Sequence, residues 1–314
     1  MSRLFIALAT YNGEKYLELF LRSLIDQTLK ADQIIAVDDA SSDGSVAILE
    51  RYAKTLPIQI IRQKNNQGHR ASFERALEEI HKQKLPGDFV ALADQDDVWL
   101  PNKLFILNQK IKEADLIFGD AEVIDEEGNV IHSSWRSLAF ISPSQPFLAH
   151  IAGINNVSGC LSLFKADLLD DLLPIPKGVS VHDRWLAIFA EKRKGVKAIS
   201  DLVVQYRLHE ENAVGLKKNS SMAHSILVNI NWLKMLIDEA NRIPLTKDEV
   251  TFTTALLDLQ MLREKQMLVP SYLLWVWGNR NILFFNTNSL KEKIKKTLFS
   301  VVGLPFARQF LRKS

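Results

Sequence analysis

Three carboxylates follow a short apolar run in the segment FVALADQDDVWLP, residues 89–101. Asp94, Asp96 and Asp97 are so close in the chain that each charge raises the pKa of its neighbours unless a cation lies among them. Carboxylate oxygens are the ligands that Mg²⁺ and Mn²⁺ prefer, and Mg²⁺ often shares its shell with substrate phosphates. The alternative is a solvated turn, in which aspartates bond to nearby backbone, so this motif alone supports both interpretations equally.

A second acidic pair stands in VDDASSDGS, residues 37–45. Asp43 or Ser45 suits a helix N-cap, because its side-chain oxygen accepts from free N–H groups of the first turn. Asp38 and Asp39 end an apolar run, where a carboxylate can accept a ribose hydroxyl or the imide N–H of a pyrimidine. The patterns G-x-G-x-x-G after the first strand and G-x-x-x-x-G-K-[ST] are both absent, so a nucleotide here would need a metal on its phosphates.

Two more candidates lie further along the chain. Asp183 in VHDRW, residues 181–185, precedes an amphipathic pattern. It either caps a helix, the more frequent role of such an aspartate, or acts as a general base. His209 in YRLHEENAVG, residues 206–215, follows a strand pattern. A lone histidine is usually structural, but beside a hard cation its imidazole can join the metal shell.

The first half of the chain predicts the scaffold that positions these side chains. Apolar runs at 3–10, 33–39, 58–63 and 88–94 predict strands, and segments with helical spacing of apolar residues separate them. This alternation predicts an α/β fold with a mostly parallel sheet covered by helices on both faces. In such sheets ligands bind beyond the carboxyl ends of the strands. Because TYNG, DDASSDGS, NNQG and DQDD all fall at these ends, we expect one site there.

The character of the chain changes near residues 216–225. Residues 115–215 mix short strand patterns with helical ones, whereas the later residues predict helices with little strand signal. We therefore expect an α/β domain at 1–218 and a helical C-terminal region at 219–314.

The last segment, residues 289–314, interleaves basic and apolar side chains. It suits peripheral contact with an anionic bilayer and packing on the domain or on a second subunit equally well. Its apolar members are Leu298, Phe299, Val301, Val302, Phe306 and Phe310.

Composition narrows the classes of function. A net charge of +2 over 314 residues gives no case for a nucleic-acid partner. The single cysteine, Cys160, excludes an intramolecular disulfide framework and fits a reducing compartment. No uninterrupted apolar stretch reaches the length of about 18 residues that a transmembrane helix needs. The N-terminus reads as a first strand and not as a secretory signal, so we expect a cytoplasmic protein, with the inner membrane face as a further location.

Over about residues 3–215 the chain resembles the family 2 glycosyltransferases with the GT-A fold, through the ordered motifs ATYNG, VDDASSDGS, NNQG, LADQDDVWLPNKL, VSGC, VHDRW and YRLHEENAVG. The forms DQDDVW, HDRW and YRLHEENAVG are most similar to the bacterial branch of rhamnosyltransferases and related polysaccharide-assembly enzymes. The resemblance implies a mostly parallel sheet flanked by helices, with a nucleotide-binding half and an acceptor half. The helical segment after 216 lies outside it.

The resemblance also implies roles for matching residues. Contact with the donor nucleotide is implied for Thr10, Tyr11, Asn12, Asp39 and Asp94. A D-x-D site for Mn²⁺ or Mg²⁺ is implied for Asp94 and Asp96, and His209 is expected to approach the metal or the diphosphate. Asp183 is the implied catalytic base, and Asp97 and Trp99 are implied to shape the sugar pocket.

The implied reaction is inverting transfer of a sugar from a nucleoside-diphosphate donor to a hydroxyl of a glycan or lipid-linked saccharide in bacterial surface polysaccharide synthesis. The favoured donor is dTDP-rhamnose, followed by a UDP-sugar. One alternative is a metal-dependent sugar nucleotidyltransferase, although ATYNGEKY lacks the usual glycine-rich basic loop. Another is a non-catalytic protein that binds sugar nucleotides. The sequence leaves open whether the chain forms a homo-oligomer.

Overall fold

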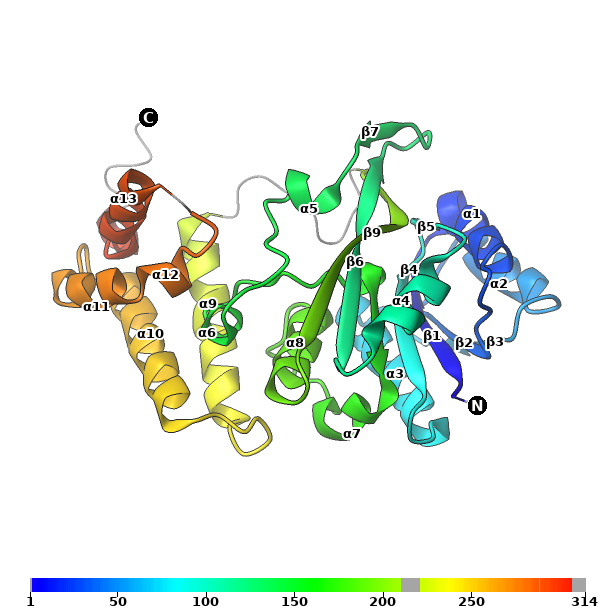
Figure 1. Ribbon diagram of the computed structural model, residues 1–314, viewed down its shortest axis with the longest axis horizontal. Helices are drawn as coiled ribbons and strands as arrows, with labels where there is room; N and C mark the ends of the chain where they lie inside the picture. The colour runs from blue at the N-terminus through cyan, green and yellow to red at the C-terminus, as the bar shows by residue number, and fades with distance from the viewer. Residues whose placement is uncertain (1, 210–220, 288, 307–314) are drawn as a thin grey trace. The chain divides into compact units, whose positions relative to one another are not determined.

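The computed structural model describes residues 2–209, 221–287 and 289–306 (Figure 1). The expected domain boundary at 218/219, the end of the YRLHEENAVG motif and Phe310 lie outside the described residues. The strands are β1 (Leu4–Thr10), β2 (Gln33–Asp38), β3 (Ile58–Arg62), β4 (Phe89–Asp94), β5 (Val98–Trp99), β6 (Leu116–Ile124), β7 (Val130–His132), β8 (Ser162–Lys165) and β9 (Val196–Arg207).

In the part of the chain that the structure describes, these strands form one nine-stranded sheet in the order β3-β2-β1-β4-β8-β6-β9-β5, with β7 paired to β6. β1 to β4 are parallel, so their carboxyl ends lie at one edge. β8 runs antiparallel to β4 and β6, and β9 runs parallel to β6. All seven residues of β1 are buried. Because successive side chains of a strand point to opposite faces, both faces of the sheet are covered there.

Helices that pack on the strands supply this cover. In all, the described residues form thirteen α-helices. They are α1 (Glu14–Ile25), α2 (Ser45–Tyr52), α3 (His69–Gln83), α4 (Lys103–Ile111), α5 (Trp135–Leu138), α6 (Phe147–Ile151), α7 (Leu169–Leu172), α8 (His182–Lys192), α9 (Met222–Asp238), α10 (Lys247–Lys265), α11 (Leu273–Gly278), α12 (Arg280–Leu283) and α13 (Leu290–Ser300), with 3₁₀ turns η1 (Gly159–Leu161), η2 (Ala166–Leu168) and η3 (Pro270–Tyr272). α1 packs on α2 and β5, α4 on β6, β8 and β9, and α3 on β1 and β2 beside α7 and α8.

The local sequence explains the elements that frame the site. Leu17, Phe20, Leu21 and Leu24 recur at helical spacing in α1 and are at most 4% exposed. The four strands expected at 3–10, 33–39, 58–63 and 88–94 are confirmed as β1 to β4, each end within one residue. The α/β class is confirmed with them. The pairing of β8, β5 and β9 joins segments far apart in the chain, which no local pattern specifies.

The chain divides into two compact units. The first comprises residues 1–143, 157–175 and 181–215 and holds the whole sheet. The second comprises residues 144–156, 176–180 and 216–314. Two short internal segments therefore belong with the C-terminal helices, an arrangement that a single boundary near 218 cannot express.

The second unit has its own core. α9 packs against α10, and α6 against α10 and α12. The indole of Trp232 is 2% exposed and donates to the carbonyl of Ile151 at 2.9 Å. None of the helices in the described ranges combines the length and the hydropathy of a bilayer-crossing segment.

Candidate functional site

A cavity of about 570 Å³ opens at the carboxyl edge of β1, β2 and β4 in the sheet-bearing unit. It is bounded by the loops after these strands, the N-terminal ends of α3 and α8, the turn at η1 and the end of β9. Eight of the residues singled out in the sequence line it: Thr10, Tyr11, Asn12, Asp39, Asp94, Asp96, Asp183 and His209. The expected convergence of polar motifs on one edge is therefore observed.

The loop after β1 is held by side chains from two other loops. Gln95 accepts from the backbone N–H of Tyr11 and donates to its carbonyl, both at 2.9 Å. Asn12 adopts a left-handed φ of 45°, and its side-chain oxygen accepts from Ser42 N–H at 2.9 Å. Gly13 follows, where a Cβ would stand 2.2 Å from the Gln95 side chain. With its backbone fixed, the ring of Tyr11 is left 47% exposed at the cavity.

Asp39 fixes the loop between β3 and α3. One of its oxygens accepts from Gln67 N–H at 2.8 Å and from the Gln63 amide at 2.9 Å, and the other accepts from Gly68 N–H at 2.7 Å. A carboxylate has about four acceptor positions, so three are used and one is left for a ligand. Asp39 therefore anchors the cavity wall as well as lining it.

Two histidine side chains each contact one carboxylate of the acidic cluster after β4. The Nε2 atom of His69 lies 3.3 Å from Asp94 Oδ1, and that of His209 lies 2.8 Å from Asp96 Oδ2. Burial favours a raised pKa for Asp94, but the hydrogen bond to His69 and the charge of His69 leave that pKa lowered. Asp94 is therefore an anion at neutral pH, and the cluster does not lack partners.

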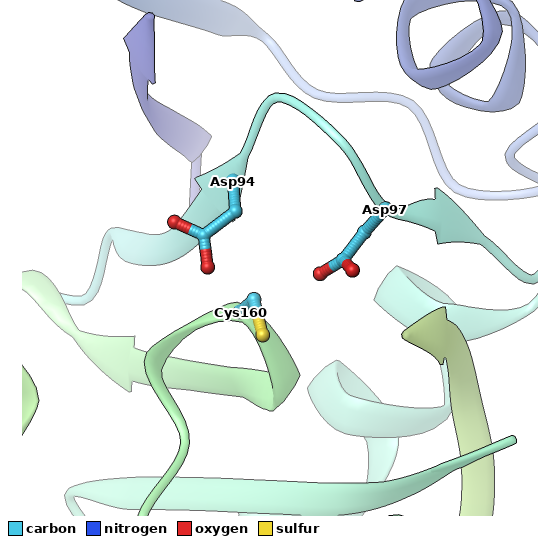
Figure 2. Close-up of side chains that lie close together, drawn as sticks. All are labelled: Asp94, Asp97 and Cys160. Carbon is cyan, nitrogen blue, oxygen red and sulfur yellow. The ribbon is translucent and has the colours of Figure 1, made fainter. Parts of the chain in front are cut away.

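Asp97 behaves differently, because burial and the charges of Asp96 and Asp94 raise its pKa well above the ordinary value. Its carboxylate accepts from Arg207 N–H at 3.1 Å and points toward Asp94 and Cys160 (Figure 2). Burial and the acidic neighbours disfavour the charged form of Asp97, whereas His69 stabilises the charged form of Asp94. The cluster after this buried strand therefore does not hold three equivalent charges.

Asp97 and Trp99, which were expected to shape a sugar pocket, are not among the residues that line this cavity. Each is 1% exposed. The Trp99 ring packs edge-on against Phe20 and beneath the Lys103 ammonium, which lies 3.3 Å from the ring centroid. Burial lowers the pKa of Lys103 to about 7. The aromatic after DQDD is a core residue because β5 turns it inward, beside α1 and β9.

The donor chemistry of the cavity fits a hard divalent cation. Asp94 and Asp96 offer carboxylate oxygens and His209 an imidazole, a set that suits Mn²⁺, with the carboxylates suiting Mg²⁺ as well. Among the described residues, the ligand atoms that lie within 4.8 Å of one another in a group of three belong to Asp94, Asp97 and Cys160 (Figure 2). Asp94, Asp96 and His209 therefore line one cavity without forming such a close group. The close group contains the sulfur of Cys160, which favours softer metals.

Asp183 stands at the start of α8 but does not cap it. The N-cap residue is Val181, whose side chain makes no capping bond. Asp183 Oδ2 instead accepts from Gly159 N–H at 3.2 Å, across to the η1 turn. Burial raises the pKa of Asp183 to about 6, against the lowering effects of the Gly159 N–H, Arg184 and His69. A carboxylate with this pKa can take up a proton near neutral pH.

Further cavity residues were not singled out from the sequence. His182 is 4% exposed and stacks on Phe73 at 4.0 Å, and its ring nitrogens have no hydrogen-bond partner among the described residues. Burial lowers the pKa of His182 to about 3, so its ring is neutral. His69, Trp135 and Tyr206 also line the cavity. The sequence signal for these two histidines was their position, since His182 lies within the motif VHDRW and His69 directly follows NNQG.

A family model described as Glycosyl transferase family 2 matches residues 5–173. Among curated proteins, an uncharacterized glycosyltransferase of Rickettsia conorii is 26% identical over 251 residues, which cover 74% of this chain and 37% of that protein. The dTDP-rhamnosyl transferase RfbG of Shigella flexneri is 28% identical over 225 residues, covering 66% of this chain and 73% of RfbG. The chain thus spans little more than a third of the first of these relatives.

Two solved structures share the fold. TarS residues 1–349 of S. aureus in complex with UDP-GlcNAc gives a TM-score of 0.59 at 16% identity, over 96% of this chain and 84% of that one. The mannosyltransferase PcManGT of Pyrobaculum calidifontis in complex with GDP-Man and Mn²⁺ gives 0.54 at 15% identity, over 99% and 88%. At these identities the likeness concerns the fold alone, and with the family match it confirms the expected GT-A type architecture.

Proposed function

Because the chain belongs to glycosyl transferase family 2, we propose that it transfers a sugar from a nucleoside-diphosphate donor to an acceptor hydroxyl, with inversion at the anomeric carbon. One observation carries the proposal: the carboxylates of Asp94 and Asp96 line the same cavity as the buried carboxylate of Asp183. The reaction needs a site for the diphosphate and a base for the acceptor in one enclosure. The three aspartates meet both needs.

Asp183 is the proposed base. It accepts the proton of the acceptor hydroxyl as that oxygen attacks the anomeric carbon from the face opposite the leaving diphosphate. Its raised pKa supports this role, since a base ionised near neutral pH keeps useful proton affinity. The bond from Gly159 N–H holds one carboxylate oxygen, which orients the other.

Asp94 and Asp96 are the proposed ligands of Mn²⁺ or Mg²⁺, with His209 beside them. A bound cation would offset the negative charge that develops on the leaving nucleoside diphosphate. The contact of His209 with Asp96 orients that carboxylate toward the cavity wall. The contact of His69 with Asp94 does the same on the other side.

The nucleoside is proposed to bind along Thr10, Tyr11, Asn12 and Asp39. The exposed Tyr11 ring offers a face on which a base can stack. The unused acceptor position of Asp39 suits a ribose hydroxyl or a base N–H. Both lie at the carboxyl ends of β1 and β2, where nucleotides bind in open α/β sheets.

The favoured donor is dTDP-rhamnose, and a UDP-sugar is the next candidate. The likeness to RfbG, whose name records dTDP-rhamnosyl transfer, supports the first. The shared fold with TarS, solved with UDP-GlcNAc, supports the second. We place the acceptor among glycans and lipid-linked saccharides of a bacterial surface polysaccharide, and the reaction in the cytoplasm.

The proposed function is tested by measuring the binding of donors by calorimetry and their hydrolysis by assay. The donors are dTDP-, UDP- and GDP-sugars, each with Mn²⁺, Mg²⁺ or EDTA. We expect metal-dependent binding of one donor class. Binding that EDTA leaves unchanged would remove the metal from Asp94 and Asp96 while keeping the donor site. Failure of every donor to bind would favour a protein whose site has decayed.

A further inference from the structure

The helix α13 exposes a row of apolar side chains. Leu290 is 62% exposed, Ile294 45% and Leu298 55%, and Phe299 is 51% exposed. Residues four apart in a helix lie on one face, so Leu290, Ile294 and Leu298 form a continuous ridge. Single exposed leucines are common on protein surfaces, but a ridge along a whole helix marks an interaction face.

The ridge is flanked by positive charge. α13 contains Lys291, Lys293, Lys295 and Lys296 against one acidic residue, Glu292. Lys293 and Lys296 donate to the uncharged oxygens of Asn281 and Thr287 at 2.8 and 2.6 Å. Within the described ranges, no ion pair is recorded for these four lysines. The helix therefore presents its charge without neutralisation by its own unit.

A strip of α13 that adjoins the ridge is fixed to the second unit, while the ridge itself stays exposed. Thr297 is 4% exposed, and α13 packs against α11. Val301, just after the helix, is 7% exposed and accepts from Val269 N–H at 2.8 Å. Val301 and Val302 were expected to share the apolar face of the tail, but Val301 turns inward and Val302 bridges to Leu268. The exposed ridge consists instead of Leu290, Ile294 and Leu298, and Phe299 is exposed on another side of the helix.

We propose that α13 docks the protein on an anionic lipid bilayer, lying in the plane of the interface. A helix of eleven residues is about 16 Å long, too short to cross a membrane but long enough to seat one apolar ridge below the headgroups. Lysines on both flanks of the ridge fit anionic headgroups. Charge complementarity of this kind favours a lipid surface over a second copy of the same cationic helix, which it would repel. On α11, which packs on α13, Leu274 is 82% exposed and adds apolar surface.

Vesicle flotation of the full chain tests the proposal without donor, metal or acceptor, so its outcome is independent of the proposed transfer. Vesicles of phosphatidylcholine alone are compared with vesicles containing about a third phosphatidylglycerol. We expect binding to the anionic vesicles, weakened as salt is raised. Ile294→Ser with Leu298→Ser should weaken it at least 10-fold, and Lys291→Gln with Lys295→Gln about 30-fold.

The matched control is Phe105→Ser, which removes a half-exposed aromatic from α4 in the other unit and should leave binding unchanged. Far-ultraviolet circular dichroism checks that each variant is folded. Absence of flotation, or equal flotation on neutral vesicles, would overturn the proposal. Light scattering tests the alternative that the ridge binds a second copy of the chain. A dimer that the ridge variants abolish, together with no binding to vesicles, would also overturn the proposal.

Discussion

The carboxyl group of Asp183 lies where burial disfavours its charge. It is 9% exposed, its pKa is raised to about 6, and Arg184 and His69 oppose the rise only in part. At pH 7 such a group is mostly ionised yet retains affinity for a proton. The same burial that tunes it as a base makes the ionised form costly to the fold.

Asp183→Asn should lower the transfer rate by roughly 100-fold or more, because the amide cannot accept the acceptor proton. In the unaltered protein, kcat/KM should rise with pH through an apparent pKa of about 6, since only the ionised carboxylate acts. Stopped assays from pH 5 to 8 measure both effects. Donor binding by calorimetry is the control: a matching loss of donor affinity would reassign Asp183 to structure.

The ionisation of Asp183 that favours catalysis should lower the free energy of unfolding. The folded pKa lies above the ordinary value of 3.8, so the contribution of Asp183 to stability is fully present below about pH 4 and is lost as pH rises through 6. Asp183→Asn should therefore be more stable than the unaltered chain at pH 7, by at most about 3 kcal/mol, with the difference vanishing near pH 4. Urea unfolding at the two pH values measures this. A variant less stable at pH 7 would contradict it.

Asp96→Ala should abolish metal-dependent nucleotide binding, because it removes one of two proposed carboxylate ligands and the partner of His209. Titration of the donor nucleotide with and without Mn²⁺ measures the loss. Asp26→Ala is the control: Asp26 is an exposed aspartate at the end of α1 that does not line the cavity. Undiminished Mn²⁺-dependent binding in Asp96→Ala would exclude the metal assignment.

At the scale of elements, the cavity depends on loops that are tied to one another across the sheet edge. Asp39 holds the loop before α3, Gln95 holds the loop after β1, and Gly159 reaches the first turn of α8. The strands supply fixed ends, and these bonds set where each polar side chain stands between them.

The close approach of β6 and β9 gives a prediction about stability. A Cβ at Gly119 would lie 2.6 Å from Val203 Cγ2 and 2.9 Å from the Asp201 carbonyl. Gly119→Ala should therefore destabilise the fold by about 1–3 kcal/mol in urea unfolding. Gly278→Ala, where nothing lies within 4 Å, should cost nothing or stabilise slightly. Equal free energies of unfolding for the two variants would contradict this, because β6 and β9 could then move apart without loss of stability.

At the scale of the molecule, ligand binding should report on the sheet-bearing unit. A donor present with Mn²⁺ at 100 times its dissociation constant should raise the free energy of unfolding by about 2.7 kcal/mol, because it binds the folded state alone. EDTA should remove the increase. Thermal unfolding followed by the near-ultraviolet signal measures the shift. An increase that survives EDTA would indicate that the donor binds without metal.

The sequence by itself determined the α/β class, the first four strands and the edge at which Asp39, Asp94 and Asp96 lie. Each follows from a local period or from the rule that parallel strands end together. Only the tertiary structure decided that Trp99 is buried, that burial raises the pKa of Asp97, and that Asp183 and His182 face the cavity. These depend on residues distant in the chain, such as Phe20, Cys160 and Phe73.

The same division holds for the C-terminal helices. Lysines interleaved with apolar residues predicted an amphipathic tail, but the pattern could not say which apolar side chains pack inward. In the structure Val302 bridges to Leu268 and Val301 is buried, whereas Leu290 and Ile294 stay exposed. Spacing fixes which residues share a face, whereas burial depends on what the rest of the chain brings against that face.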